Sequence, residues 1–75
     1  MSKPQELIEY IAKAIVDDGE AVNVVETEGG KMLELETADD DRGRVIGRQG
    51  RVAKAMRAVL GASREGSRVR LEIVD

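Results

Sequence analysis

The residues with the clearest chemical potential are two glycines three positions apart, surrounded by cations. Gly47 and Gly50 enclose Arg48 and Gln49. A turn with so little side-chain bulk exposes its backbone, and the N–H groups that begin a following helix point outward at its positive end. The cations around this turn are Arg44, Arg48, Arg51 and Lys54. Guanidinium groups bind phosphate oxygens bidentately, so the pattern favours a phosphodiester backbone as the ligand.

The charge of the chain is divided in a way that supports an anionic ligand. The net charge of the 75 residues is −3. Residues 1–41 hold three basic and twelve acidic side chains, whereas residues 42–75 hold nine basic and three acidic ones. The second part therefore carries +6 against −9 in the first. Such asymmetry indicates an anionic partner, or two oppositely charged faces that attract each other.

The composition excludes most catalytic chemistry. The chain has no Cys, His, Trp or Phe, so it has no thiolate, imidazole base or zinc ligand of these types. Asp39, Asp40 and Asp41 precede a helical segment, where negative charge favours a helix start, and the further ligands of an EF-hand loop are missing. We predict no enzyme activity, no metal, no cofactor and no small-molecule substrate.

Other glycine motifs fit less well. A Walker loop needs Gly-Lys-Ser/Thr after its four spacers, but the four residues after Gly43 lead to Arg48 and Gln49. A Rossmann fingerprint needs a strand before it and glycine at position 45, which is Val45. A helix-turn-helix also has a glycine-containing turn, but its first helix would span only residues 42–46 here.

The first half of the chain predicts a helix followed by a hairpin. Ser2 and Gln5 fit a capping box before an apolar stripe that runs to Val16, and Gly19 is the expected stop. Tyr10, the one aromatic residue, is expected to pack partly buried on this helix. Residues 22–27 and 32–37 predict two strands joined by a glycine turn.

The second half predicts two helices and a strand. After the short helix at 42–46 and the glycine turn, residues 51–60 form a longer helix that ends at Gly61. Its expected apolar stripe is Val52, Ala55, Met56, Val59 and Leu60. Residues 69–74 predict the last strand. The fold class is therefore α+β, in the order α-β-β-α-α-β, with a three-stranded mixed sheet covered on one face by three helices.

These residues carry a family resemblance. The run Val45-Ile46-Gly47-Arg48-Gln49-Gly50, with small or aliphatic residues at Val52, Ala53 and Met56, resembles the signature of a KH domain, whose Gly-x-x-Gly loop clamps about four nucleotides. The element order is similar to that of the type II arrangement. In so short a chain, residues 43–60 resemble the KhpA family of small bacterial RNA-binding proteins, with residues 1–75 as a single KH domain.

The resemblance implies specific roles. Gly47 and Gly50 would be the clamp glycines, with Arg48 and Gln49 on the sugar-phosphate chain. Ile46 would line an aliphatic groove for bases, whose opposite wall we expect from the strand at 32–37, near Glu34 and Glu36. The implied RNA-binding residues are Arg44, Ile46, Gly47, Arg48, Gln49, Gly50, Arg51 and Lys54.

The resemblance also implies partners. The protein would bind single-stranded RNA as an RNA chaperone or post-transcriptional regulator, and would form a homodimer or pair with a larger KH-containing protein. A dimerisation module with secondary RNA binding is the alternative function. No apolar run approaches the length of a membrane span, and no signal peptide is evident, so we expect a cytoplasmic protein.

Overall fold

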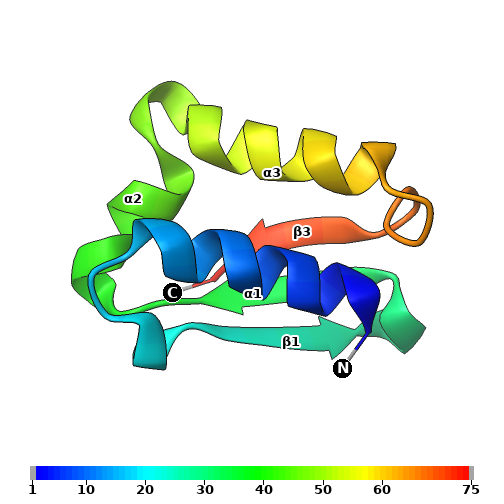
Figure 1. Cartoon of the computed structure of the whole chain (residues 1–75), viewed down its shortest axis with the longest axis horizontal. Helices are drawn as coiled ribbons and strands as arrows, with labels where there is room; N and C mark the ends of the chain where they lie inside the picture. Colours follow the sequence, from blue (N-terminus) through cyan, green and yellow to red (C-terminus); the bar gives the residue numbers. More distant parts are fainter. Residues whose placement is uncertain (1, 75) are drawn as a thin grey trace.

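The computed structural model describes residues 2–74, which form three α-helices and three strands joined by short turns. The helices are α1 (Lys3–Ile15), α2 (Arg42–Ile46) and α3 (Arg51–Ala62). The strands are β1 (Asn23–Thr27), β2 (Met32–Glu36) and β3 (Arg70–Ile73). All three helices lie on one face of the sheet (Figure 1), which confirms the predicted α+β class and element order.

The sheet is mixed, with β2 in the centre. The strand order is β1-β2-β3, in which β1 pairs with β2 antiparallel and β3 pairs with β2 parallel. The register places Leu35 between Val24 and Ile73, and Leu33 beside Leu71. These alternate residues form the face toward the helices, because a strand points successive side chains to opposite sides. The hairpin and the parallel crossover are therefore as predicted.

The core lies between this face and the helices. Its largest fully buried side chains come from four elements and are Ile8, Leu33, Leu35, Val45, Met56 and Leu60. The predicted capping box is present, with Ser2 Oγ accepting from Gln5 N and Gln5 Oε1 accepting from Ser2 N. Gln5 Nε2 also donates to Val24 O at 3.1 Å, which fixes the start of α1 against β1.

Several element ends differ from the prediction. α1 ends at Ile15, and Val16 is already extended, so Gly19 begins a short 3-10 turn and does not end the helix. α3 continues through Gly61 to Ala62, and its last carbonyls accept from Ser63 N. Glycine lowers helix stability by only about 1 kcal/mol, which packing of the preceding turns offsets.

The exposed faces of two helices also correct the prediction. The buried side chains of α3 are Ala53, Met56 and Leu60, whereas Ala55 is exposed and Val59 is 44% exposed. Tyr10 is 77% exposed and does not pack as expected. Ile8 is buried on α1, and a residue two positions later lies about 200° around the helix, on the solvent side.

Candidate nucleic-acid interface

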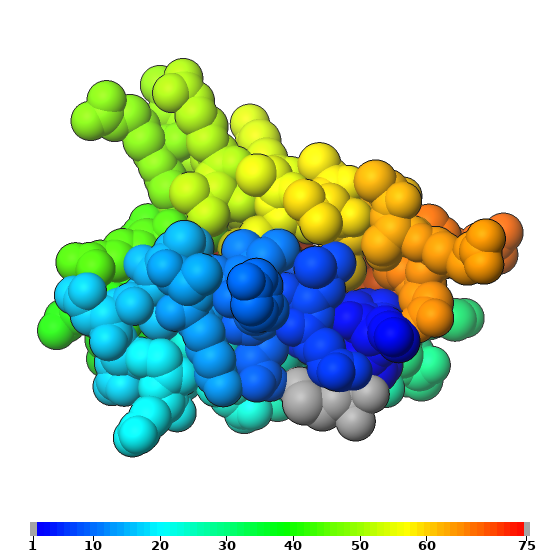
Figure 2. All heavy atoms as spheres, viewed as in Figure 1, coloured from blue at the N-terminus to red at the C-terminus, as the bar shows by residue number. Residues whose placement is uncertain are grey.

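The segment between α2 and α3 is a tight turn that projects from the molecule. α2 ends at Ile46, where Gly47 N donates to Gly43 O at 2.8 Å. Gly50 N then donates to Gly47 O at 3.0 Å, and α3 begins at Arg51. Figure 2 shows the chain around residues 47–51 standing out from the body of the protein. We call residues 47–50 the clamp loop.

The two glycines are required for different reasons. Gly47 has φ 78° and ψ 168°, a conformation that is open almost only to glycine. A Cβ at this position would lie 2.5 Å from Val52 Cγ2 and 2.8 Å from Val52 N. Gly50 is left-handed at φ 72° and ψ 16°, and a Cβ there would meet nothing within 4 Å. Position 47 therefore requires glycine because of both its steric surroundings and its backbone conformation. Position 50 favours glycine because of its backbone conformation alone.

The side chains of the clamp loop are open to solvent. Arg48 and Gln49 are exposed, and Gln49 is held in a left-handed conformation at φ 58°. Arg51 Nη2 donates to Gln49 Oε1 at 3.0 Å, so the amide nitrogen of Gln49 is directed away from this contact. Within residues 2–74, neither Arg48 nor Lys54 makes a hydrogen bond or an ion pair through its side chain. Both cations are available to a ligand.

The start of α3 adds a positive end to the same surface. Its N-cap is Gly50, which has no side chain to accept from the first N–H groups of the helix. Unsatisfied N–H groups and the helix dipole together favour an anion. α3 has 12 residues, and no acidic side chain lies in its first turn. The predicted site residues Gly47, Arg48, Gly50 and Lys54 are thus brought to one end of one helix.

Arg44 is engaged elsewhere. Its Nη1 lies 2.7 Å from Asp17 Oδ1, and its Nε lies 3.8 Å from Asp41 Oδ1. Asp17 is 79% exposed at its side chain, so this pair is open to water. Of the predicted RNA-binding cations, Arg44 is the one whose side chain forms ion pairs with carboxylates of the protein itself.

Asp41 is a buried residue that sequence reasoning missed. It is 2% exposed, and its carboxylate accepts from Asp18 N and Asp17 N. Two hydrogen bonds lower the pKa of Asp41 below 3.8, and the one from Asp18 N–H has a larger effect than the one from Asp17 N–H. Burial of the carboxylate raises the pKa but is outweighed, and the positive charge of Arg44 lowers the pKa further. Asp41 is the N-cap residue of α2, at the helix start where negative charge was expected, but its carboxylate makes no hydrogen bond to the first N–H groups of that helix. Nothing in the sequence separates it from Asp39 and Asp40.

The strand beside the clamp helices is also different from the expected one. Ile46 is 37% exposed next to the clamp loop, as the base of a groove requires. However, α2 and α3 contact β3, and β2 is the central strand. The strand that these helices contact is therefore β3, and not the strand at residues 32–37 that we expected beside them. Glu36 accepts from Asn23 Nδ2 on β1, away from this wall.

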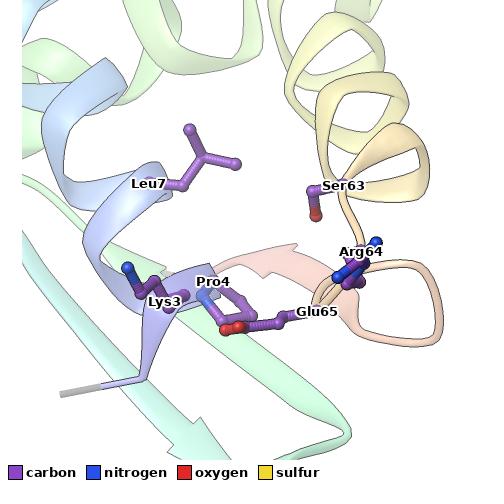
Figure 3. Close-up of a pocket in the computed structure, with 6 residues that line it drawn as sticks. All are labelled: Lys3, Pro4, Leu7, Ser63, Arg64 and Glu65. Atoms are coloured by element: carbon purple, nitrogen blue, oxygen red, sulfur yellow. The ribbon is translucent and has the colours of Figure 1, made fainter.

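A pocket of ≈ 310 Å³ lies at the other end of α3. Figure 3 shows Leu7 and Pro4 of α1 facing Ser63 and Glu65 of the loop after α3. It is far along the helix from the clamp loop and forms no part of it (Figure 1).

The sequence comparisons agree with this geometry. A sequence model of the KhpA/KhpB KH domain matches residues 5–73. The chain belongs to the KhpA/KhpB family of KH domains. The family is non-enzymatic, so the protein is not an enzyme, as predicted.

Individual KhpA proteins match over nearly their whole length. The RNA-binding protein KhpA of Borreliella burgdorferi is 47% identical over 74 residues, which cover 93% of this chain and 90% of that protein. That of Treponema pallidum is 47% identical, covering 95% and 94%. That of Aquifex aeolicus is 42% identical, covering 100% of both. No solved structure gives a significant match.

The described residues offer neither a cluster of metal ligands nor a membrane-spanning helix. Within residues 2–74, no group of three or more Asp or Glu side chains is arranged to hold a metal ion. None of the helices in this part of the KhpA/KhpB domain is long and apolar enough to cross a membrane.

Proposed function

We propose that this protein binds single-stranded RNA without catalysis, as an RNA chaperone or post-transcriptional regulator in the cytoplasm. The clamp loop would hold the sugar-phosphate backbone against the N–H groups that begin α3. Arg44, Arg48, Arg51 and Lys54 would contact phosphates, and Ile46 would contact a base. Membership of a KH family and the name of the relatives support this proposal.

One observation carries the proposal. The clamp loop projects from the surface with exposed Arg48 and Gln49, directly before an uncapped helix. A loop that served only to pack two helices would have no need of this exposure. The chain also lacks the aromatic platforms on which other single-strand-binding folds stack bases, since its one aromatic residue lies on α1.

The test is a double substitution in the clamp loop. Arg48→Asp with Gln49→Asp should abolish binding to a short labelled RNA of random sequence, because like charge would then face the phosphates. Lys3→Asp with Ser67→Asp changes the net charge by the same amount at exposed positions outside the clamp loop, and should retain most of the affinity. Equal binding by the clamp variant and the parent at one salt concentration would contradict the proposal.

A second candidate function is association with another KH domain. Part of the exposed surface of α3 is apolar. Ala55 and Val59, which the prediction placed in the core, are exposed, Val59 at 44%, and the alanines at positions 58 and 62 are exposed as well. A shared interface would remove this apolar surface from water. The partner would be a second copy of this chain or a larger KH-containing protein, and the clamp loop would stay accessible to RNA.

A further inference from the structure

The pocket of ≈ 310 Å³ at the end of α3 opposite the clamp loop is shaped by two short segments. The first turns of α1 form one wall, and the loop after α3 forms the other (Figure 3). Its lining residues are Lys3, Pro4, Leu7, Ser63, Arg64 and Glu65. We call it the α1–α3 pocket. Its volume lies at the lower end of the range for small-ligand sites in proteins, so the matching ligand is a small one.

The wall after α3 is held in place by its own hydrogen bonds. Ser63 Oγ donates to Leu60 O at 2.8 Å and accepts from Gly66 N at 3.0 Å. Val69 N donates to Gly66 O at 3.0 Å, which joins the same turn to the segment before β3. A Cβ at position 66 would lie 2.5 Å from Ser63 Oγ and 2.9 Å from Leu60 Cδ2, so the loop packs closely on the end of the helix. The backbone of this wall is therefore fixed at both of its ends.

The α1 wall is also fixed, and its pocket side is apolar. The capping box between Ser2 and Gln5, with the hydrogen bond from Gln5 Nε2 to Val24 O, holds the first turn of α1 against β1. Pro4 is buried, and Leu7 is half-buried and faces the loop across the pocket (Figure 3). A pocket with two positioned walls needs little reorganisation to accept a ligand, which favours binding.

Three charged side chains line the pocket and are not paired with one another. Lys3 belongs to the α1 wall, and Arg64 and Glu65 belong to the loop. All three are exposed, and none of them makes a side-chain hydrogen bond or ion pair to any residue between positions 2 and 74. Figure 3 shows the Glu65 carboxylate extended toward Pro4, whereas the Arg64 side chain stays beside the loop. The pocket therefore offers a carboxylate and a guanidinium that are both open to a ligand.

We infer that the α1–α3 pocket binds a free α-amino acid with an aliphatic side chain, as a ligand that is released unchanged. Such a ligand is a zwitterion at neutral pH, so its ammonium pairs with Glu65 and its carboxylate with Arg64, whose guanidinium holds two oxygens. Its side chain lies against Leu7 and Pro4 and leaves water. Lys3 adds a second positive charge, which favours the carboxylate further. A peptide terminus carries only one of the two ligand charges, and a phosphate meets Glu65 with no ammonium to offset it.

The experiment follows the backbone amide shifts of the full chain by NMR at pH 7 while L-leucine is added. The amides of Leu7 and of residues 63–66 should shift and saturate with a dissociation constant of about 1 mM or lower, and those of the clamp loop should stay unchanged. N-acetylleucine lacks the ammonium and leucinamide lacks the carboxylate, so each should bind at least about ten-fold more weakly. Glycine lacks the aliphatic side chain and should also bind more weakly.

Variants assign each charge of the pocket to one group of the ligand. Glu65→Gln should weaken leucine about ten-fold but should not weaken N-acetylleucine, because that analogue has no ammonium. Arg64→Gln should weaken leucine but not leucinamide, which has no carboxylate. Glu72→Gln and Arg68→Gln make the same charge changes at exposed positions outside the pocket and should bind leucine as the parent does. All four variants should keep the thermal midpoint of the parent, measured by circular dichroism.

Three results would overturn the inference. One is the absence of saturating shifts in the pocket up to about 20 mM leucine. The second is N-acetylleucine that binds as tightly as leucine, which would make a peptide carboxyl terminus the occupant. The third is a leucine affinity that survives both Glu65→Gln and Arg64→Gln. RNA binding is measured separately, because the clamp loop lies at the other end of α3. Parent protein that binds leucine but no RNA would overturn the proposed function alone.

Discussion

Asp41 Oδ2 accepts a hydrogen bond from Asp18 N at 3.0 Å, across 23 residues of sequence. Asp41 Oδ1 accepts from Asp17 N at 3.1 Å. The first contact joins the turn after α1 to the residue that precedes α2, and α2 leads directly into the clamp loop. A single buried carboxylate therefore fixes where the clamp loop begins relative to α1.

The first prediction concerns the pH dependence of stability. The folded pKa of Asp41 lies below 3.8, so the unfolded chain takes up a proton first as the pH falls. The contribution of Asp41 to the free energy of unfolding is complete above about pH 4 and declines below it, until Asp41 is protonated in the folded protein as well. Asp41→Asn should lower the thermal midpoint at neutral pH and flatten its decline in acid.

The control for this prediction is Asp40→Asn. Asp40 is exposed and makes no side-chain hydrogen bond or ion pair among the described residues, so its removal should leave the thermal midpoint nearly unchanged. Asparagine at position 41 can accept only one of the two backbone N–H groups, and the other stays unpaired. Equal melting of the Asp41 and Asp40 variants at neutral pH, followed by circular dichroism, would contradict this role.

The second prediction separates the two clamp glycines. Gly47→Asn should destabilise the protein by about 1–3 kcal/mol and abolish RNA binding, because its conformation excludes other residues and its Cβ would strike Val52. Gly50→Asn should keep the fold at a cost of about 1 kcal/mol or less, since asparagine tolerates the left-handed region. Denaturant unfolding and RNA titration of both variants check the prediction. It fails if Gly50→Asn is the more damaging change.

The third prediction concerns Arg44, whose guanidinium forms an ion pair with Asp17. Asp17→Asn removes the carboxylate 2.7 Å from Arg44, so a phosphate no longer competes with it for the guanidinium. We expect RNA affinity to rise a few-fold and the free energy of unfolding to fall by about 0.2–1 kcal/mol, as is typical of an exposed pair. Glu9→Gln, which breaks the exposed pair with Lys13 on α1, is the matched control. If Asp17→Asn binds RNA with the same affinity as the parent protein, Arg44 does not belong to the proposed RNA-binding site.

The sequence predicts the fold well where its local signals agree. The capping box at Ser2, the alternation around Leu33 and the glycine turn at Gly47 each combine a backbone requirement with a pattern of apolar residues. The element order follows from these signals, and the mixed sheet follows from the crossover. The short helix at Arg42–Ile46 was predicted with the bounds that the structure has.

The site is only partly predictable because its remaining features depend on packing between distant segments. The burial of Asp41 depends on backbone N–H groups more than 20 residues away. The contact of Arg57 with Leu71 depends on β3, and not β2, lying next to α3. Likewise, the apolar stripe of α3 is wider than its buried face, so periodicity alone could not decide that Val59 is exposed.

The last prediction tests whether this exposed face of α3 is an interface. Val59→Glu places a charge on the apolar surface, at a side chain that is 44% exposed, and leaves the buried Ala53, Met56 and Leu60 unchanged. If two copies associate through this face, the variant should sediment as a monomer at concentrations where the parent is a dimer, with unchanged circular dichroism. Ala14→Glu, on the exposed side of α1, should sediment as the parent does.

This experiment also distinguishes association from RNA binding. Val59 lies on α3 five residues beyond Lys54 and outside the clamp loop, so Val59→Glu should leave the affinity of one protein chain for RNA largely intact. A charged residue in a desolvated interface would lose its hydration, which costs several kcal/mol and is enough to dissociate a small dimer. A parent that sediments as a monomer at every concentration would exclude self-association, and a Val59→Glu variant that remains dimeric would exclude this face.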